Sequence, residues 1–267
     1  MKSRRSPVQS LRDIAEVRGH QVFGLAALLI GIAGIALHSL QSNWPSLGDA
    51  AFTIATSIVL MVGGVAMQFP KTDKLGAIAV GVVYLLFALT LVPQILAQPR
   101  VYASWGNVFY QLALVAGAMV AYGLASPSGP LSKTICRLAV VIFGLSAASF
   151  AVEQLEFLDR TISLVPTWIP PGGMFWAIAT TIAFGLAAVS LISGYKSLLA
   201  SQLMTSMLLF FVVAIWIPRL VADPRSNSNW SEGVDTFAIA AAAWLIAGFL
   251  NSAYPIVHQA RQRDDHP

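Results

Sequence analysis

The sequence predicts an all-α membrane protein with eight transmembrane helices, and three observations support this fold class. Hydrophobic residues make up 57% of the 267 residues. Only 10% of the residues are charged, whereas a soluble domain carries about 25%. The apolar residues form continuous windows, unlike the alternating segments of an outer-membrane barrel. This composition excludes a water-soluble enzyme, a disordered chain and a disulfide scaffold, since Cys136 is the single cysteine.

Eight windows are long and apolar enough to cross a bilayer, whose hydrocarbon core takes about 20 helical residues. They lie at residues 21–40, 50–69, 75–96, 108–125, 135–155, 173–195, 200–220 and 234–254. The first window follows a basic stretch, as in a secretory signal peptide, but its apolar run is longer than the usual signal core. We therefore expect it to be the first transmembrane helix.

The basic residues predict the orientation of these helices. Placing the N-terminus in the cytoplasm puts 12 of the 16 lysines and arginines on the cytoplasmic side. The four on the outer side are Arg100, Arg160, Arg219 and Arg225. Short cytoplasmic connections are enriched in basic residues in this way. We therefore expect both termini to lie in the cytoplasm, and no nucleic-acid partner, because the basic residues form no patch.

The two halves of the chain share a motif at a constant separation of 125 residues. Residues 92–105 read VPQILAQPRVYASW, and residues 217–230 read IPRLVADPRSNSNW. Both segments contain Pro-x5-Pro-Arg-x4-Trp, which indicates an internal duplication. Each half holds four windows, so both repeats begin on the same side of the membrane and are parallel. The predicted organisation is a basic N-terminus (1–19), a first four-helix repeat (20–125), a linker (126–134), a second four-helix repeat (135–256) and a cytoplasmic tail (257–267).

The motif has an anchoring interpretation and a ligand-binding interpretation. In the second half, Pro218 can bend or end a helix, Arg225 can reach lipid headgroups, and Trp230 suits the membrane interface. The first-half equivalents are Pro93, Arg100 and Trp105. Six of the seven tryptophans fall at predicted outer ends or in outer loops. This asymmetry favours either outer loops embedded in the interface or an aromatic-lined site on that side.

Three segments of the second half resemble the DoxX-like family of bacterial membrane proteins. They are LVPTWIPPGGMFW at residues 164–176, GLAAVSLISGYKSLLASQLM at residues 185–204, and the motif at residues 217–230. The similarity covers most of residues 136–250 and is looser in the first half, which has Gln94 where the second half has Arg219. The family unit is four transmembrane helices, so the resemblance implies a tandem duplication. Some relatives are small subunits of a quinol oxidase or membrane partners of oxidoreductases, which implies a quinone-linked role.

Polar residues near the predicted outer ends are the candidates for a binding site. Glu153 and Glu156 are three residues apart and so lie on one helix face. These carboxylates could bind a quinol headgroup and accept its proton, or they could meet water where the helix ends. The residues predicted for an outer-face site are Arg219, Arg225, Glu153, Trp168 and Trp230, with Arg100 and Trp105 as repeat counterparts.

The sequence contains no pattern typical of a catalytic or metal centre. Only His20 and His258 could meet at one membrane depth, and both lie at the interface, which is a poor basis for bis-histidine haem ligation. HExxH and clustered Cys/His patterns are missing, as is a nucleotide-binding loop. We therefore expect no metal and no independent catalytic activity, and a quinone is the one cofactor candidate.

Three functions remain open at this point. The leading one is an accessory or quinone-associated component of a membrane redox system, with an oxidoreductase as partner. The second is a non-catalytic scaffold or lipid-interacting protein. The third is a transporter of a small neutral solute, because buried polar candidates such as Gln111 and Thr180 are not ionisable, unlike those of ion-coupled carriers. All three functions place the chain in a lipid bilayer and leave its oligomeric state open.

Overall fold

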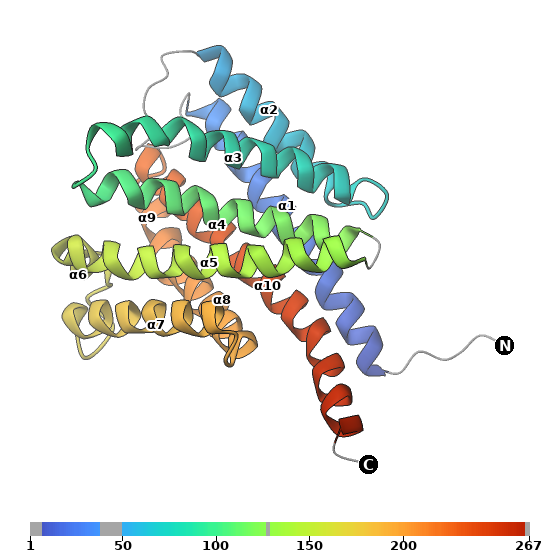
Figure 1. Ribbon diagram of the computed structural model, residues 1–267. Coiled ribbons are helices and arrows are strands. Elements are labelled where there is room, and N and C mark those ends of the chain that lie inside the picture. The colour runs from blue at the N-terminus through green and yellow to red at the C-terminus, as the bar shows by residue number, and fades with distance from the viewer. Residues whose placement is uncertain (1–6, 38–49, 127–128, 265–267) are drawn as a thin grey trace.

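The computed structural model describes residues 7–37, 50–126 and 129–264, which are built from helices and their connections (Figure 1). In chain order the helices are α1 (Pro7–Ala36), α2 (Ala50–Ala66), α3 (Asp73–Ala97), α4 (Tyr102–Ala125), α5 (Pro130–Glu156), α6 (Leu158–Leu164), α7 (Gly173–Ser193), α8 (Ser197–Phe211), η1 (Val212–Trp216), α9 (Ile217–Ala222) and α10 (Asn227–Asp264). The tryptophan predicted for the first outer loop, Trp44, lies outside the described residues.

Seven helical stretches are long and apolar enough to cross a membrane. They are Gly19–Ala36, Asp73–Ala97, Tyr102–Ala125, Pro130–Glu156, Gly173–Ser193, Ser197–Ala222 and Asn227–Ser252. They confirm the prediction of an all-α, multi-pass membrane protein. The window predicted at residues 50–69 forms a shorter apolar helix, α2, of 17 residues. The short helix α6 falls between two predicted windows.

A π-helical turn, η1, joins α8 to α9. The N–H of Ile217 bonds to the carbonyl of Val212, five residues earlier. Pro218 follows directly, and it has no N–H to donate to a carbonyl one turn before it. Its first-half equivalent, Pro93, lies inside α3 near the end of that helix. The two prolines therefore sit in different local structures, although both lie near an end of the bundle.

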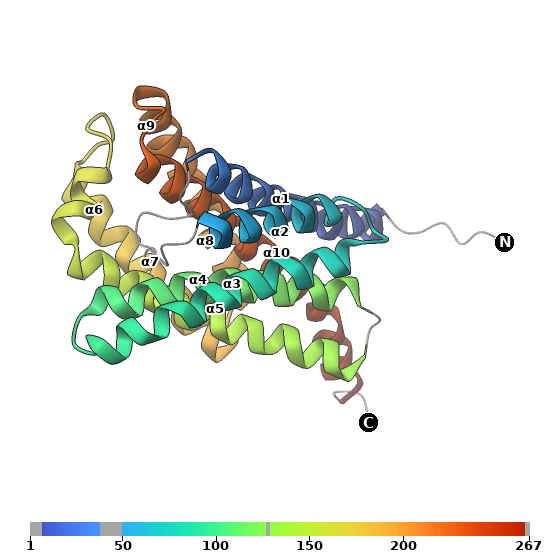
Figure 2. The same cartoon turned by 90° about the horizontal axis from the view of Figure 1, so that it is seen from above.

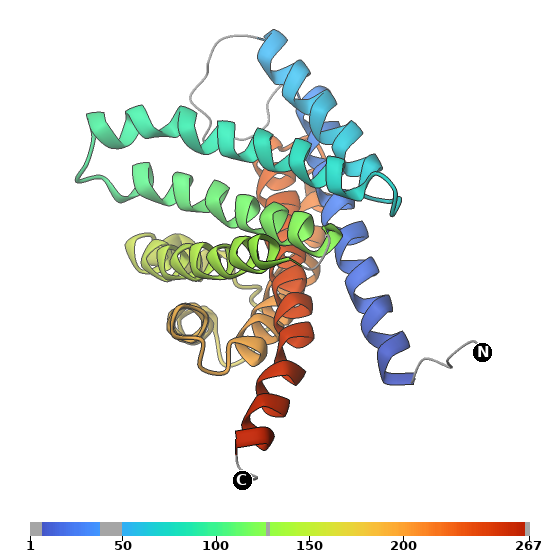
Figure 3. The same cartoon turned by 45° about the vertical axis from the view of Figure 1, so that its right-hand side comes forward.

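The helices pack in a similar pattern in the two halves of the chain. In the first half, α1 packs against α2 and α3 against α4. In the second half, α5 packs against α7 and α8 against α10. The halves meet where α4 packs against α10, while α1 also contacts α10 and α5 also contacts α4. Figures 1 and 3 show α10 running between the other helices.

Small residues allow two of these helix pairs to approach closely. A Cβ on Gly24 of α1 would lie 2.7 Å from the carbonyl oxygen of Gly64 in α2. A Cβ on Gly117 of α4 would lie 2.7 Å from the Cβ of Ala242 in α10. Gly117 and Ala242 are 125 positions apart, which is the separation of the sequence motif. The contact lies where α4 of the first half packs against α10 of the second half.

The outside of the helices carries large apolar side chains, and the ends of the bundle differ. Leu75, Leu186 and Val189 are each about two-thirds exposed, as expected for helices in contact with lipid. One end of the bundle carries α6 and α9 (Figure 2). The N-terminal part of α1 and the C-terminal part of α10 project from the opposite end.

Candidate functional site

A cavity of about 420 Å³ lies in the second half of the chain, toward the end that carries α6 and α9. It is lined by residues of α5, α6, α7, α8, η1 and α10, together with Asn107 and Tyr110 of α4. Small-molecule sites in proteins have volumes of about 300–1,000 Å³. This second-half cavity is therefore the candidate binding site.

Most of the cavity wall is apolar and aromatic. Phe150 of α5 and Phe184 of α7 are buried and meet edge to face, with ring centroids 5.7 Å apart. Tyr110 of α4 contacts Phe150 in the same geometry at 5.8 Å. Leu208 of α8 and Ile239 of α10 are also buried and complete this wall. Such a surface suits an aromatic ring or an acyl chain.

One part of the wall, the polar end, carries three carboxylates and one guanidinium. Glu153 of α5 and Glu232 and Asp235 of α10 supply the carboxylates, and Arg160 of α6 supplies the guanidinium. Asp235 is only 5% exposed. Across the described ranges, no three His, Cys, Asp or Glu side chains group closely enough to hold a metal ion. The side-chain amides of Asn107 and Gln154 also line the cavity, so its wall offers a ligand both hydrogen-bond acceptors and donors.

Gln154 connects the polar end to α7. The hydroxyls of Thr180 and Thr181 lie 3.2 and 2.9 Å from its side-chain Oε1. The same hydroxyls lie 2.8 Å from the carbonyls of Trp176 and Ala177, respectively. A hydroxyl has one hydrogen to donate, so both threonines use theirs within the protein. These contacts hold α5 against α7 directly beside Glu153.

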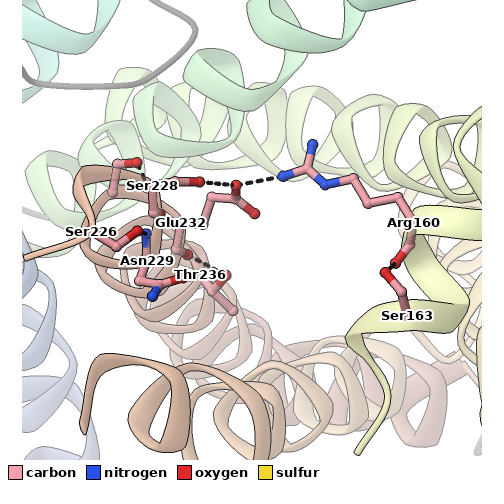
Figure 4. A network of polar contacts seen from close by, with 8 residues as sticks. Arg160, Ser163, Ser226, Ser228, Asn229, Glu232 and Thr236 are labelled. Atoms are coloured by element: carbon pink, nitrogen blue, oxygen red, sulfur yellow. Dashed lines mark hydrogen bonds and ion pairs between the residues drawn. The ribbon is translucent and has the colours of Figure 1, made fainter. Parts of the chain in front are cut away.

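The short helix α6 stands at the mouth of the cavity and is tied to its neighbours by polar contacts. Arg160 donates to Oε1 of Glu232 at 2.5 Å, and Ser228 donates to the same oxygen at 2.8 Å (Figure 4). Arg219 of α9 donates to the carbonyl of Ser163 at 3.3 Å. None of the residues of α6 is buried. Toward α9 and α10, α6 is therefore held by polar contacts rather than by a packed apolar face.

The seven residues predicted for the site are divided between the cavity, its rim and the loops. Glu153 lines the cavity. Arg219 lies at the rim, where it contacts Ser163 of α6. Trp168 is 70% exposed and lies between α6 and α7. The four that lie in or beside the two motif loops, and do not line the cavity, are Arg100, Trp105, Arg225 and Trp230.

The shared motif forms the same hydrogen bond in both halves. The indole N–H of Trp230 donates to the carbonyl of Pro224 at 2.8 Å, and that of Trp105 donates to the carbonyl of Pro99 at 3.0 Å. In each case the tryptophan follows the proline by six residues and lies in the first turn of a long helix, α10 or α4. The bond folds the loop back onto the start of the helix. This contact gives both tryptophans an anchoring role.

Most polar residues of the cavity were not among those predicted from the sequence. Asp235, Glu232 and Arg160 lie at or beside the ends of apolar windows, where charges ordinarily meet water. One sequence signal does point to the two carboxylates. Glu232, Asp235 and Thr236 are spaced so that they share one helix face. The sequence does not show that α6 lies over that helix face. Because α6 lies there, the face becomes part of the wall of a cavity.

The carboxylates on α10 have uncharged counterparts in the first half. At the separation of 125 residues, Glu232 corresponds to Asn107 and Asp235 to Tyr110. Both counterparts line the same cavity from α4. The polar end therefore combines corresponding positions from the two halves, but its charged side chains come from the second half.

No family model, curated protein or solved structure matches this chain.

Proposed function

We propose that this chain is a duplicated DoxX-like membrane protein that binds a quinone-type molecule in the second-half cavity, as an accessory component of a membrane redox system. The observation that carries the proposal is the cavity itself. It combines aromatic walls with one acidic, hydrogen-bonding end, at about 420 Å³. A quinone has the same division, since its ring and tail are apolar and its oxygen atoms are polar.

The duplication is supported by contacts that recur at a separation of 125 residues. Trp105 and Trp230 make equivalent hydrogen bonds to the proline six residues before them. Gly117 of α4 meets its counterpart Ala242 where the two halves cross. We propose two parallel repeats on this basis, with both termini in the cytoplasm and the chain in the bacterial inner membrane.

The placement of the ligand follows from the two parts of the wall. A ring would lie against Phe150 and Phe184, and its oxygen atoms would lie at the polar end, where the side-chain amides of Asn107 and Gln154 can donate to them. Quinones dissolve in the bilayer and can reach such a site from the lipid. In this proposal the protein holds the quinone, and an oxidoreductase partner carries the electrons.

The test is to identify what the purified protein binds, using a variant that fills the cavity. Ala183 of α7 lines the cavity, so Ala183→Phe should obstruct it. Leu186 lies on the same helix but is two-thirds exposed, so Leu186→Phe is the matched control. Each protein is purified in detergent and extracted with organic solvent, and the extract is analysed by mass spectrometry.

We expect about one quinone per chain in the wild type and in Leu186→Phe, and a several-fold loss in Ala183→Phe. Bulk phospholipid alone, at equal levels in all three proteins, would instead favour a scaffold or lipid-interacting protein. That second candidate is supported by the anchored motif loops, which need no ligand to explain them.

A further inference from the structure

We propose that the second-half cavity opens sideways into the lipid between α7 and α8, and that the apolar chain of the ligand leaves through this opening while its head stays at the polar end. This inference rests on the proposed function, because it specifies which quinones the cavity takes, namely those that carry a long apolar chain.

The helices α7 and α8 diverge from a common turn at residues 194–196. Both run from there toward the end of the bundle that carries α6 and α9, and the start of α7 lies apart from α9 in two views (Figures 1 and 2). Thr180 of α7 and Phe210 of α8 lie equally far from the turn along the chain, and both line the cavity. Ala183 and Met207 form a second such pair. The cavity therefore occupies the space between the two helices as they diverge.

The α8 side of this space is open toward the outside of the bundle. Phe210 lines the cavity but is 52% exposed, whereas Leu208, two residues before it, is buried. Phe210 lies near the middle of the candidate membrane span Ser197–Ala222, where the surroundings of the helix are hydrocarbon rather than water. Its ring thus stands between the cavity and the lipid. An apolar chain that passed along this ring would stay out of water.

The α7 side of the opening carries smaller side chains than its first-half equivalent. Ala179 and Ala183 are four residues apart, so they lie on one face of α7, and both line the cavity. At the separation of 125 residues they correspond to Ile54 and Ile58 of α2. Alanine leaves free the space that an isoleucine side chain would take up. This difference between the halves marks the strip of α7 along which the chain would run.

The mouth at α6 is a poorer exit for an apolar chain. Arg160 and Glu232 form an ion pair there, and the side chain of Arg160 is mostly exposed. A chain leaving by this route would separate charged groups from water and would itself meet water beyond them. The head would therefore lie at the polar end, beside Asn107 and Gln154, and the chain would lie between α7 and α8.

Photo-crosslinking locates the chain directly. The probe is a decyl-substituted benzoquinone with a diazirine at the free end of the decyl chain, and a matched probe carries the diazirine beside the ring. Each probe is illuminated with the full chain, purified in detergent, with and without an excess of the unmodified decyl-substituted benzoquinone. Peptide mass spectrometry identifies the labelled residues, and the label that the unmodified quinone removes is counted as specific.

We expect specific label from the chain-end probe on α7 and α8 near Ala179 and Phe210, several-fold above that on α6. The ring probe should instead label residues of α5, α6 and α10 at the polar end. Ala179→Ile introduces the first-half residue and narrows the opening, so it should reduce the chain-end label several-fold. Ala222→Ile is the matched control, because Ala222 is exposed on α9 and does not line the cavity. If Ala179→Ile fails to fold, the position of the label in the wild type carries the test.

The outcomes separate this inference from the proposed function. Specific chain-end label concentrated on α6 or on residues 223–226 would place the exit at the mouth, which would overturn the sideways opening and leave quinone binding in place. Labelling of the same residues by both probes would also overturn it, because the chain would then stay inside the cavity. So would an equal loss of chain-end label in Ala179→Ile and Ala222→Ile. No specific label from either probe on folded wild-type protein would overturn the proposed function as well.

Discussion

At the scale of single residues, one hydrogen bond recurs at three places in the described part of this protein. The indole N–H of a tryptophan reaches back six residues to a proline carbonyl in the loop before α4, before α10 and before α7. The third case is Trp176, which donates to Pro170 at 2.9 Å. Each of these bonds needs a donor that can lie at the membrane interface and tie the loop carbonyl to the first turn of the next helix. The tryptophan supplies that donor while its ring stays apolar, which explains why this residue stands there.

Replacing the indole tests this role. Trp230→Phe keeps an aromatic ring but removes the donor to Pro224, so the free energy of unfolding should fall by about 1 kcal/mol. Trp168→Phe is the control, because Trp168 is mostly exposed and should have little effect. Thermal unfolding of both variants in detergent, followed by circular dichroism, measures the difference. Equal changes in midpoint for the two variants would contradict the anchoring role.

The residue scale also explains why the sequence predicts only part of the site. Glu153 and Glu156 are three residues apart, which places them about 60° apart around a helix. The spacing predicts a shared face but does not say which carboxylate faces the interior. In the structure Glu153 lines the cavity and Glu156 is exposed. That choice depends on where α6 and α10 pack, which no local pattern in the sequence encodes.

At the scale of helices, one close contact between α1 and α2 depends on glycine. A Cβ on Gly24 would lie within 2.7 Å of the Gly64 carbonyl. We therefore expect Gly24→Ala to lower the free energy of unfolding by about 1–3 kcal/mol, the usual cost of overpacking. Gly185→Ala on α7 is the matched control, because nothing lies within 4 Å of its Cβ position. The control should be neutral, or more stable by up to about 1 kcal/mol, since alanine favours helix.

Unfolding in a denaturing detergent, followed by circular dichroism, measures both glycine variants. If Gly24→Ala were as stable as Gly185→Ala, the α1–α2 contact would not require glycine at this position.

The sequence predicts helices well where hydropathy alone defines their position. It predicts them less well where packing against other helices defines their position. The apolar windows match the long spans because lipid contact requires continuous apolar surface. α6 was not expected, because its seven residues carry no periodic apolar face and it is held in place by neighbours. The window at residues 50–69 predicted a full span, whereas α2 ends at Ala66 and the chain turns before Asp73.

At the scale of the whole molecule, the proposed parallel repeats predict which loops share a side of the membrane. Lys71 follows α2 and Lys196 follows α7, at positions 125 residues apart. A cysteine at either position should react with an impermeant maleimide only from the cytoplasmic side. Cysteines at Arg100 or Arg225 should react only from the outer side. The variants are made in a Cys136→Ala background, and intact cells are compared with inverted vesicles.

Labelling of Lys71→Cys and Lys196→Cys from opposite sides would contradict the parallel arrangement and indicate inverted repeats. Such a result would leave the second-half cavity unchanged as a feature of the structure. It would change the side of the membrane to which the mouth of the cavity is assigned.

The polar ties of α6 make the mouth of the cavity sensitive to salt. The Arg160 side chain is 56% exposed, and an exposed ion pair contributes about 0–1 kcal/mol. Charges in water are screened over about 8 Å at physiological ionic strength, and over shorter distances as salt rises. We therefore expect the salt content of the compartment that α6 faces to set how firmly this helix is tied to α10.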